Sequence, residues 1–320
     1  MNEVLKKLKF AVFEFKLTLE RAVEFPSFKG NVFRGALGKT LRNLTCVLKG
    51  TDTICKSCFV HDKCIYARVF EGLRRQDGSI LGNVESAPHP FVLFVPDKYR
   101  LDYPEDSHIH FFLTLIGDVV EYIPYFILAL EEIGKKGIGN TRTPFKIDSV
   151  INSGKSIYNP LEKTISKDFF LISGSDFWDE KSLGQTLTIE LVTPVRLKFG
   201  NQFQKFITFE IILRNLLRRI QLLSALYCGG PERVDFKDLI ELSKDIKLVD
   251  SSIHWEQQAR FSYRQEKIVA LGGVSGSLEF SGELNQFIPF LKVGEFLHVG
   301  KSTAYGLGKI CLRRQGKEGS

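Results

Sequence analysis

The residue types best suited to chemistry gather near the end of the sequence, in the loop 298–309. The loop holds three glycines, a histidine, two lysines and a tyrosine. Glycine lacks a Cβ, so its backbone can adopt a positive φ and present N–H groups to phosphate oxygens, while lysine supplies countercharge. The pattern predicts a phosphate-binding loop in which Lys301 supplies countercharge. His298 is the histidine best placed for proton transfer, and the alternative is a buried imidazole bonded to a backbone carbonyl.

Two other interpretations of this loop are open. Residues 300–303 read Gly-Lys-Ser-Thr, as in a nucleotide-binding P-loop, but Glu295 stands where that motif needs its first glycine. A P-loop also opens a helix, whereas residues 309–312 resemble a strand. The remaining alternative is a tight turn that closes a hairpin.

A second group of reactive side chains lies in the first half of the chain. Cys46, Cys55, Cys58 and Cys64 follow the spacing C-x8-C-x2-C-x5-C. Four thiolates this close in a cytoplasmic chain favour a tetrahedral zinc site over disulfides, and His61 could replace one ligand. An iron–sulfur cluster and plain reduced cysteines are the alternatives. A closed four-ligand site would be structural and would fasten a cysteine-rich insertion, 46–70.

The composition favours a polyanionic partner. Lys and Arg number 44 against 37 Asp and Glu, which gives a net charge of +7, and 27 Phe and 9 Tyr are interspersed among them. Such a surface is typical of nucleic-acid binding, although a basic soluble enzyme would show the same balance. No signal segment is visible at the start. The longest apolar segment, 119–130, is interrupted by Glu121 and Pro124, so we expect a cytoplasmic protein without a membrane partner.

The elements that must position these groups follow one order twice. In the first half, alternation predicts strands at 10–19, 91–95, 109–115 and 146–150, and three- to four-residue spacing predicts helices at 32–44 and 119–136. In the second half, strands are expected at 186–197, 254–264, 267–280 and 309–312, with helices at 206–227, 235–243 and 284–291. The order β-α-β-β-α-β is ferredoxin-like. We therefore predict an α+β protein with an N-terminal domain at 1–155, a linker at 156–183 and a C-terminal domain at 184–320.

Several segments together resemble a known family. The loop resembles the glycine-rich loop of the RAMP superfamily of CRISPR RNA-binding proteins. That loop reads glycine, a hydrophobic residue and glycine, then a basic spacer, then the same three residue types again. In this sequence His298 stands in place of the first glycine. The whole chain resembles the cysteine-containing branch of the CRISPR repeat-processing endoribonucleases, the sixth CRISPR-associated family. That resemblance rests on residues 33–38, 64–71, 250–265, 271–276 and 297–301.

The resemblance implies two tandem ferredoxin-like (RAMP/RRM-like) domains and a metal-independent cut in precursor CRISPR RNA. The ribose 2′-hydroxyl would attack the adjacent phosphate, which requires a base, an acid and donors to the phosphorane. The expected catalytic residues are His298, Lys301, Tyr305, Arg34 and His254. The expected RNA contacts are Gly300, Ser302, Thr303, Gly306, Gly308, Lys309, Lys39, Arg42, Arg260 and Arg264.

One departure from the family leaves the function open. Many relatives carry a histidine on the first helix, whereas residues 29–46 contain none. The alternative function is a non-catalytic RAMP subunit that binds guide RNA. Implied partners are CRISPR repeat RNA, the precursor of guide RNA, and other CRISPR-associated effector proteins. No cofactor is expected for catalysis, and a structural zinc is expected.

Overall fold

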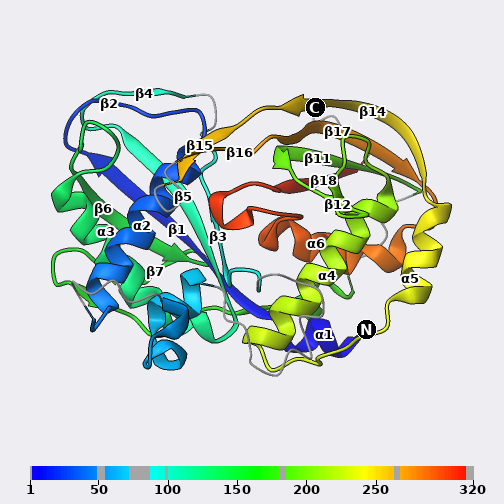
Figure 1. Cartoon of the computed structure of the whole chain (residues 1–320), viewed down its shortest axis with the longest axis horizontal. Helices are drawn as coiled ribbons and strands as arrows, with labels where there is room; N and C mark the ends of the chain where they lie inside the picture. The colour runs from blue at the N-terminus through cyan, green and yellow to red at the C-terminus, as the bar shows by residue number, and fades with distance from the viewer. Residues whose placement is uncertain are drawn as a thin grey trace. The chain divides into compact units, whose positions relative to one another are not determined.

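The chain folds into two compact units (Figure 1). The computed structural model describes residues 2–48, 55–71, 87–97, 100–179, 185–262 and 267–314. One unit is Phe10–Leu171, and the other combines Met1–Lys9 with Ile172–Ser320. These bounds differ from the predicted domains, since residues 1–9 join the second unit and residues 156–171 join the first.

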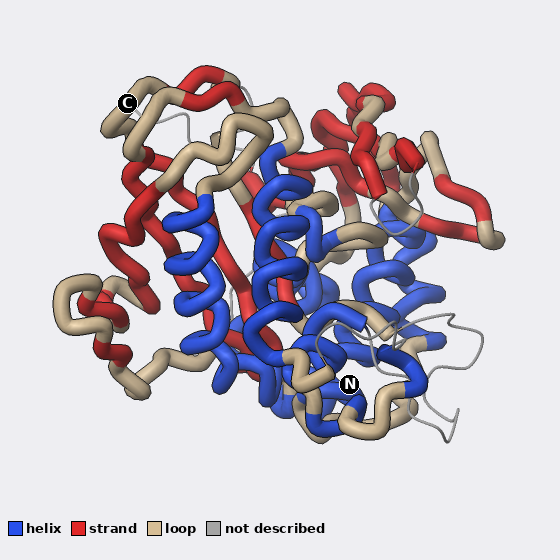
Figure 2. The backbone as a smooth tube through the Cα atoms, turned by 60° about the vertical axis from the view of Figure 1, so that its left-hand side comes forward, coloured by secondary structure: helices blue, strands red, loops and turns tan. Residues whose placement is uncertain are grey.

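The Phe10–Leu171 unit is a ferredoxin-like α+β fold. Its strands pair antiparallel in the order β3-β5-β1-β6-β7, and α2 and α3 pack against each other on the sheet (Figure 2). The bounds are β1 (Lys9–Leu19), α2 (Lys29–Thr45), β3 (Phe91–Phe94), β5 (His108–Ile116), α3 (Ile123–Lys136), β6 (Phe145–Asn152) and β7 (Lys155–Ser156). Two short pairs complete the unit, β2 (Val23–Glu24) with β4 (Asp102–Tyr103) and β8 (Tyr158–Asn159) with β9 (Thr164–Ile165).

Alternation in β1 creates the core of this unit. Phe13, Phe15 and Leu17 are fully buried, while the residues between them are partly exposed. Phe15 stacks on Phe111 of the neighbouring strand, with ring centroids 4.7 Å apart. The helix predicted at 119–136 begins later than expected, at Ile123. Pro124 lies in the first turn of α3, where a backbone N–H would have no partner within the helix, so its absence breaks no hydrogen bond.

The second unit repeats the fold. Its sheet has the order β14-β17-β11-β18, which is the same ferredoxin-like order, and α4 and α6 cover one face (Figure 1). The bounds are β11 (Thr186–Val195), α4 (Phe209–Tyr227), α5 (Lys237–Leu242), β14 (Lys247–Glu256), β17 (Gly273–Ser281), α6 (Ile288–Leu297) and β18 (Ile310–Arg314). The hairpins are β12 (Lys198–Phe199) with β13 (Gln202–Phe203) and β15 (Ala259–Ser262) with β16 (Lys267–Ala270). The predicted α+β class and the repeated order are confirmed.

The N-terminal residues form a helix of the second unit. α1 (Asn2–Lys7) contributes Val4 and Leu5, which are fully buried. The hydroxyl of Ser224 on α4 donates to the carbonyl of Val4 at 3.1 Å. Leu5 also approaches Gly174, where an added Cβ would lie 2.9 Å from the Leu5 carbonyl oxygen. The segment 172–177, expected to be linker, is therefore part of this core as β10 (Ile172–Ser173) and a following 3-10 turn.

Candidate functional site

The glycine-rich loop of the second unit is a folded structure whose glycines are required by close approach. Gly300 has φ of 87° and Gly308 has φ of 80°. A Cβ on Gly300 would lie 2.4 Å from the Arg196 carbonyl oxygen, and one on Gly308 would lie 2.0 Å from that of Val299. Neither contact is sterically possible, so no other residue fits without moving the backbone.

Backbone hydrogen bonds tie this loop to the end of β11. The Val299 N–H donates to the Gly308 carbonyl at 2.8 Å, and the Lys301 N–H donates to the Arg196 carbonyl at 3.0 Å. The Thr193 hydroxyl donates to the Gly306 carbonyl at 2.8 Å. The loop therefore presents its outward side chains from a fixed backbone.

The predicted contact residues of the loop divide into two groups. Lys301 is exposed, and Ser302 and Tyr305 are partly exposed, so these side chains can reach a ligand. Thr303, Gly306 and Gly308 are buried. Their contribution is to shape the loop, and we do not place them in contact with RNA.

Lys309 also acts within the protein. Its ammonium donates to the Glu295 carbonyl at 2.6 Å, and burial lowers the pKa of Lys309. Glu295 in turn accepts from the Leu312 N–H at 2.8 Å, which joins α6 to β18. Lys309 is thus a link between these two elements, in contrast to its predicted role as an RNA contact.

His298 is buried, with 2% of its surface exposed. Its Nδ1 lies 3.0 Å from the Leu307 carbonyl oxygen. Because a carbonyl only accepts, Nδ1 carries the proton. Burial, aided by the nearby Lys309 cation, lowers the pKa of His298 well below its usual value. This is the arrangement named above as the alternative to catalysis, and the geometry gives no support to the predicted proton transfer.

The backbone of His298 explains its departure from the family pattern. Its φ is 59° and its ψ is 164°, a region that is essentially restricted to glycine. The residue therefore occupies a glycine conformation at the C-terminal end of α6, where the resembled pattern has glycine.

Two arginines near this loop were not predicted as site residues. Arg219, expected on the outer face of its helix, is 7% exposed and donates from Nε to the Leu297 carbonyl at 2.9 Å. Burial lowers its pKa to about 10. Arg196 is half-buried and donates from Nη1 to the Ala270 carbonyl at 3.2 Å. Spacing alone gives no signal for either arrangement, because both depend on contacts distant in sequence.

The site residues predicted on the helix at 32–44 lie on α2, in the Phe10–Leu171 unit. Lys39 and Arg42 are exposed on α2, and the Arg42 guanidinium lies 6.0 Å from the ring centroid of Tyr66. Arg34 is partly buried, with its guanidinium 5.3 Å from the ring of Phe70. Arg34 also lies 3.5 Å from Nε2 of His89, a histidine that the spacing did not single out.

The remaining predicted residues belong to the long hairpin. His254 is exposed on β14, opposite Ser275 of β17. Arg260 lies on β15, opposite Val269, and its side chain lies outside the described residues. Arg264 lies outside them altogether.

The P-loop alternative is wrong. Gly300 and Lys301 lead into a 3-10 turn, Thr303–Tyr305, and then into the strand β18. Without a following helix, there is no helix N-terminus to hold a nucleotide phosphate.

The four clustered cysteines line one small cavity. Arg42, His61 and Tyr66 line it as well. Its volume is about 30 Å³, enough for one or two water-sized groups. The donor chemistry suits zinc. However, among the described residues no three His, Cys, Asp or Glu side chains are arranged to hold a metal ion. The structural zinc therefore stays a prediction.

None of the helices within the described ranges is long and apolar enough to cross a bilayer. The longest apolar segment of the sequence, 119–130, covers the end of a 3-10 turn and the first half of α3. α3 is amphipathic and packs on the sheet of its own unit.

Comparisons with known proteins agree with this architecture. Residues 8–169, half of the chain, match the AF_1859 N-terminal domain family, and residues 189–310 match the family described as CRISPR-associated endoribonuclease Cas6. An uncharacterized protein of Archaeoglobus fulgidus is 24% identical over 298 residues, which are 90% of this chain and 92% of that protein.

Solved structures share the fold at low identity. Thermus thermophilus Cas6 matches with a TM-score of 0.57 and 13% identity over 96% of this chain and 99% of that chain. A chain of a partial Cas6-RT-Cas1–Cas2 complex matches with a TM-score of 0.58 and 13% identity. The match covers 98% of this chain, which spans only 47% of that one. The chain therefore belongs to the AF_1859 N-terminal domain family, and its residues 189–310 are similar to the CRISPR-associated endoribonuclease Cas6 family.

Proposed function

We propose that this protein is an endoribonuclease that binds CRISPR repeat RNA and cuts the precursor transcript without a metal ion. The 2′-oxygen forms a bond to the adjacent phosphorus while the bond from phosphorus to the 5′-oxygen breaks. A base removes the 2′-hydroxyl proton and an acid protonates the departing 5′-oxygen. The products are a 2′,3′-cyclic phosphate and a free 5′-hydroxyl.

The observation that carries this proposal is the geometry of the glycine-rich loop within the region that matches Cas6. Gly300 and Gly308 hold the loop in positive-φ conformations, and the Lys301 N–H is fixed on the Arg196 carbonyl. The backbone that carries Lys301 is therefore held in place, and its exposed side chain is accessible to a phosphate. A cation beside the reacting phosphate stabilises the charge that develops there.

The groups proposed for the cutting step are those that remain accessible. Lys301 and Tyr305 would stabilise the phosphorane and hold the ribose. His254 is exposed on β14 and is the accessible histidine of this unit as far as the structure describes it. Arg34, Lys39 and Arg42 on α2 would bind the RNA backbone. His298 would support the loop and leave proton transfer to others.

A second candidate function is a non-catalytic guide-RNA subunit. It is favoured by two facts: residues 29–46 contain no histidine, and His298 is buried. The chain of the Cas6-RT-Cas1–Cas2 complex that shares this fold is about twice as long as this one, and its presence in that complex motivates testing CRISPR-associated proteins as partners.

A chelation experiment separates these two functions. Purified protein is incubated with repeat RNA in excess EDTA, and the product ends are mapped. The proposal predicts one cut with a 2′,3′-cyclic phosphate and a 5′-hydroxyl. Tight binding with no cut, with and without added Mg²⁺, would favour the non-catalytic subunit.

A further inference from the structure

A small hairpin next to the glycine-rich loop carries an exposed ring on each face: Phe203 lies beside Arg196 and Lys198, and Phe199 has the Arg214 guanidinium 5.9 Å from its ring centroid. β12 and β13 pair with Lys198 opposite Phe203 and Phe199 opposite Gln202. The loop between them is Gly200-Asn201, with φ of 57° and 65°. Positive φ at both positions is typical of a two-residue hairpin loop. Residues directly opposite share a face, so Lys198 and Phe203 lie on one face and Phe199 lies on the other.

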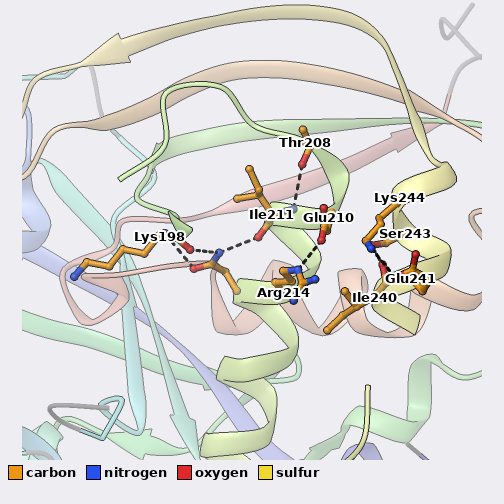
Figure 3. Close-up of polar contacts among 10 residues, drawn as sticks. Lys198, Thr208, Glu210, Ile211, Arg214, Ile240, Glu241, Ser243 and Lys244 are labelled. Carbon is orange, nitrogen blue, oxygen red and sulfur yellow. Dashed lines mark hydrogen bonds and ion pairs between the residues drawn. The ribbon is translucent and has the colours of Figure 1, made fainter. Parts of the chain in front are cut away.

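The hairpin is fastened to α4. Asn215 donates from Nδ2 to the Lys198 carbonyl at 3.1 Å and accepts from the Lys198 N–H at 3.3 Å. The same Nδ2 also donates to the Ile211 carbonyl within α4, at 2.9 Å. Figure 3 shows the Lys198 side chain extended away from the helix. The backbone of the hairpin is therefore held while this side chain reaches outward.

Cations lie over two exposed rings, one on the hairpin and one on the neighbouring strand β14. Phe203 is 40% exposed, and the Arg196 guanidinium and Lys198 ammonium lie 4.5 and 5.3 Å from its ring centroid. Trp255 of β14 is also 40% exposed, with the Lys205 ammonium 5.5 Å from its ring. We call these five residues, Arg196, Lys198, Phe203, Lys205 and Trp255, the ring–cation face.

The ring–cation face joins the glycine-rich loop through Arg196. The backbone of Arg196 forms a parallel bridge with Gly300, and its carbonyl accepts from the Lys301 N–H. Its side chain donates to the Ala270 carbonyl, at the end of the strand that leads to Gly272. The Trp255 ring packs so closely there that a Cβ on Gly272 would lie 2.8 Å from it. Contacts of Arg196 thus connect the surroundings of Phe203 and Trp255 to the backbone of Lys301.

We propose that the ring–cation face stacks unpaired nucleotides of the RNA next to the phosphate held by the glycine-rich loop. An aromatic ring and a base stack through their faces, and the flanking ammonium and guanidinium groups pair with the phosphates between the bases. The exposed rings have three cations beside them, Arg196, Lys198 and Lys205, which suits a polyanion better than an apolar peptide. This inference rests on the proposed function for the choice of RNA as the ligand. It adds the path that the RNA follows as it leaves the glycine-rich loop.

Intrinsic fluorescence gives a direct test, because the chain contains only two tryptophans, Trp178 and Trp255. In the full-length Trp178→Phe protein, titration with oligouridylate should quench the emission of Trp255 and saturate. Affinity should be higher for repeat RNA that carries an unpaired flank than for the same RNA without it. Emission unchanged at saturating RNA would overturn the proposal.

Substitutions on the two faces of the hairpin provide matched variants. Phe203→Ala should weaken binding of the flanked RNA by about 5- to 150-fold, the usual cost of one lost base stack, without changing the salt dependence. Phe203→Leu, which keeps apolar volume and is less disruptive to folding, should weaken it almost as much. Phe199→Ala, on the opposite face and 45% exposed, should change it by less than about 2-fold, an expectation set by stacking magnitudes. Equal effects from Phe199 and Phe203 would contradict the assignment of a face.

Cleavage assays separate failure of this inference from failure of the proposed function. If repeat RNA is cut but Phe203→Ala and Trp255→Ala bind it normally, the ring–cation face is wrong and the endoribonuclease stands. If Trp255 is quenched and Phe203→Ala weakens binding while no RNA is cut, the face stands and the endoribonuclease is wrong.

Discussion

The imidazole of His298 donates from Nδ1 to the carbonyl oxygen of Leu307 across the glycine-rich loop, at 3.0 Å. This bond joins the residue after α6 to the middle of the Gly-Leu-Gly segment. A side chain thereby supports a loop whose first family glycine is missing, while the backbone of His298 keeps the glycine-like φ of 59°. His298, which the sequence suggested as a catalytic residue, thus stabilises the conformation of the loop.

This relationship predicts how two substitutions of His298 will differ. His298→Ala loses the hydrogen bond and keeps a Cβ at positive φ, whereas His298→Gly loses the bond and relieves the backbone. We expect His298→Gly to be the more stable of the two by about 1 kcal/mol, measured by urea unfolding. Single-turnover cleavage by His298→Gly should stay within a few-fold of wild type. A loss of about 100-fold or more in a folded variant, the scale of lost acid–base catalysis, would restore the proton-transfer role.

The same burial predicts a pH dependence of stability. The pKa of His298 is lowered in the folded state by burial, by Lys309 and by Arg219, against the Leu307 carbonyl. The unfolded chain therefore binds a proton below about pH 6.5 that the folded chain does not, so stability is fully present above that pH and falls as pH decreases. Wild type should lose up to about 1.4 kcal/mol per pH unit more than His298→Gly between about pH 6.5 and 5. Parallel pH profiles of the two proteins would refute this.

Lys301 is predicted to act by charge. Lys301→Ala should weaken repeat RNA binding and lower the slope of log affinity against log salt by about 0.7, the value for one contact to single-stranded nucleic acid. Lys237→Ala removes an equal charge from exposed α5 and is the control. Titrations at several salt concentrations should leave its slope at the wild-type value. The same slope change in both variants would show that only net charge matters.

The cysteine cavity supports a test of the predicted zinc. Protein purified under reducing conditions should carry about one zinc per chain, as expected of a single four-thiolate site. Cys55→Ser combined with Cys58→Ser should lose the metal and lower the thermal midpoint. Cys228→Ser, which lies at the end of α4, should change neither. Elemental analysis that finds no metal in the fresh wild-type protein would remove the site.

Local periodicity was enough to predict the architecture. The strand at 10–19 and the helix at 206–227 appear as β1 and α4, because one buried face at a fixed period determines each of them. The boundaries that differ have local causes as well. α4 begins at Phe209 because the Thr208 hydroxyl caps it, accepting from the Ile211 N–H at 3.4 Å.

The site was predictable only in part. The type and spacing of residues located the glycine-rich loop, since positive φ and glycine go together. They could not show that Lys309 bonds inward to Glu295 or that Arg219 is buried, because those contacts join elements far apart in sequence. The ring–cation face did have a local signal, Lys-Phe-Gly-Asn-Gln-Phe, in which a Gly-Asn turn is flanked by aromatic residues.

The central claim, that the 2′-hydroxyl of the RNA is the nucleophile, is tested most directly with two substrates. Single-turnover cleavage in EDTA is measured on repeat RNA and on the same RNA with one 2′-deoxy substitution at the scissile nucleotide. We predict cleavage of the all-ribose RNA at that nucleotide and none of the substituted RNA, although both bind with similar affinity. Cleavage of the substituted RNA at the same bond would contradict the proposed chemistry.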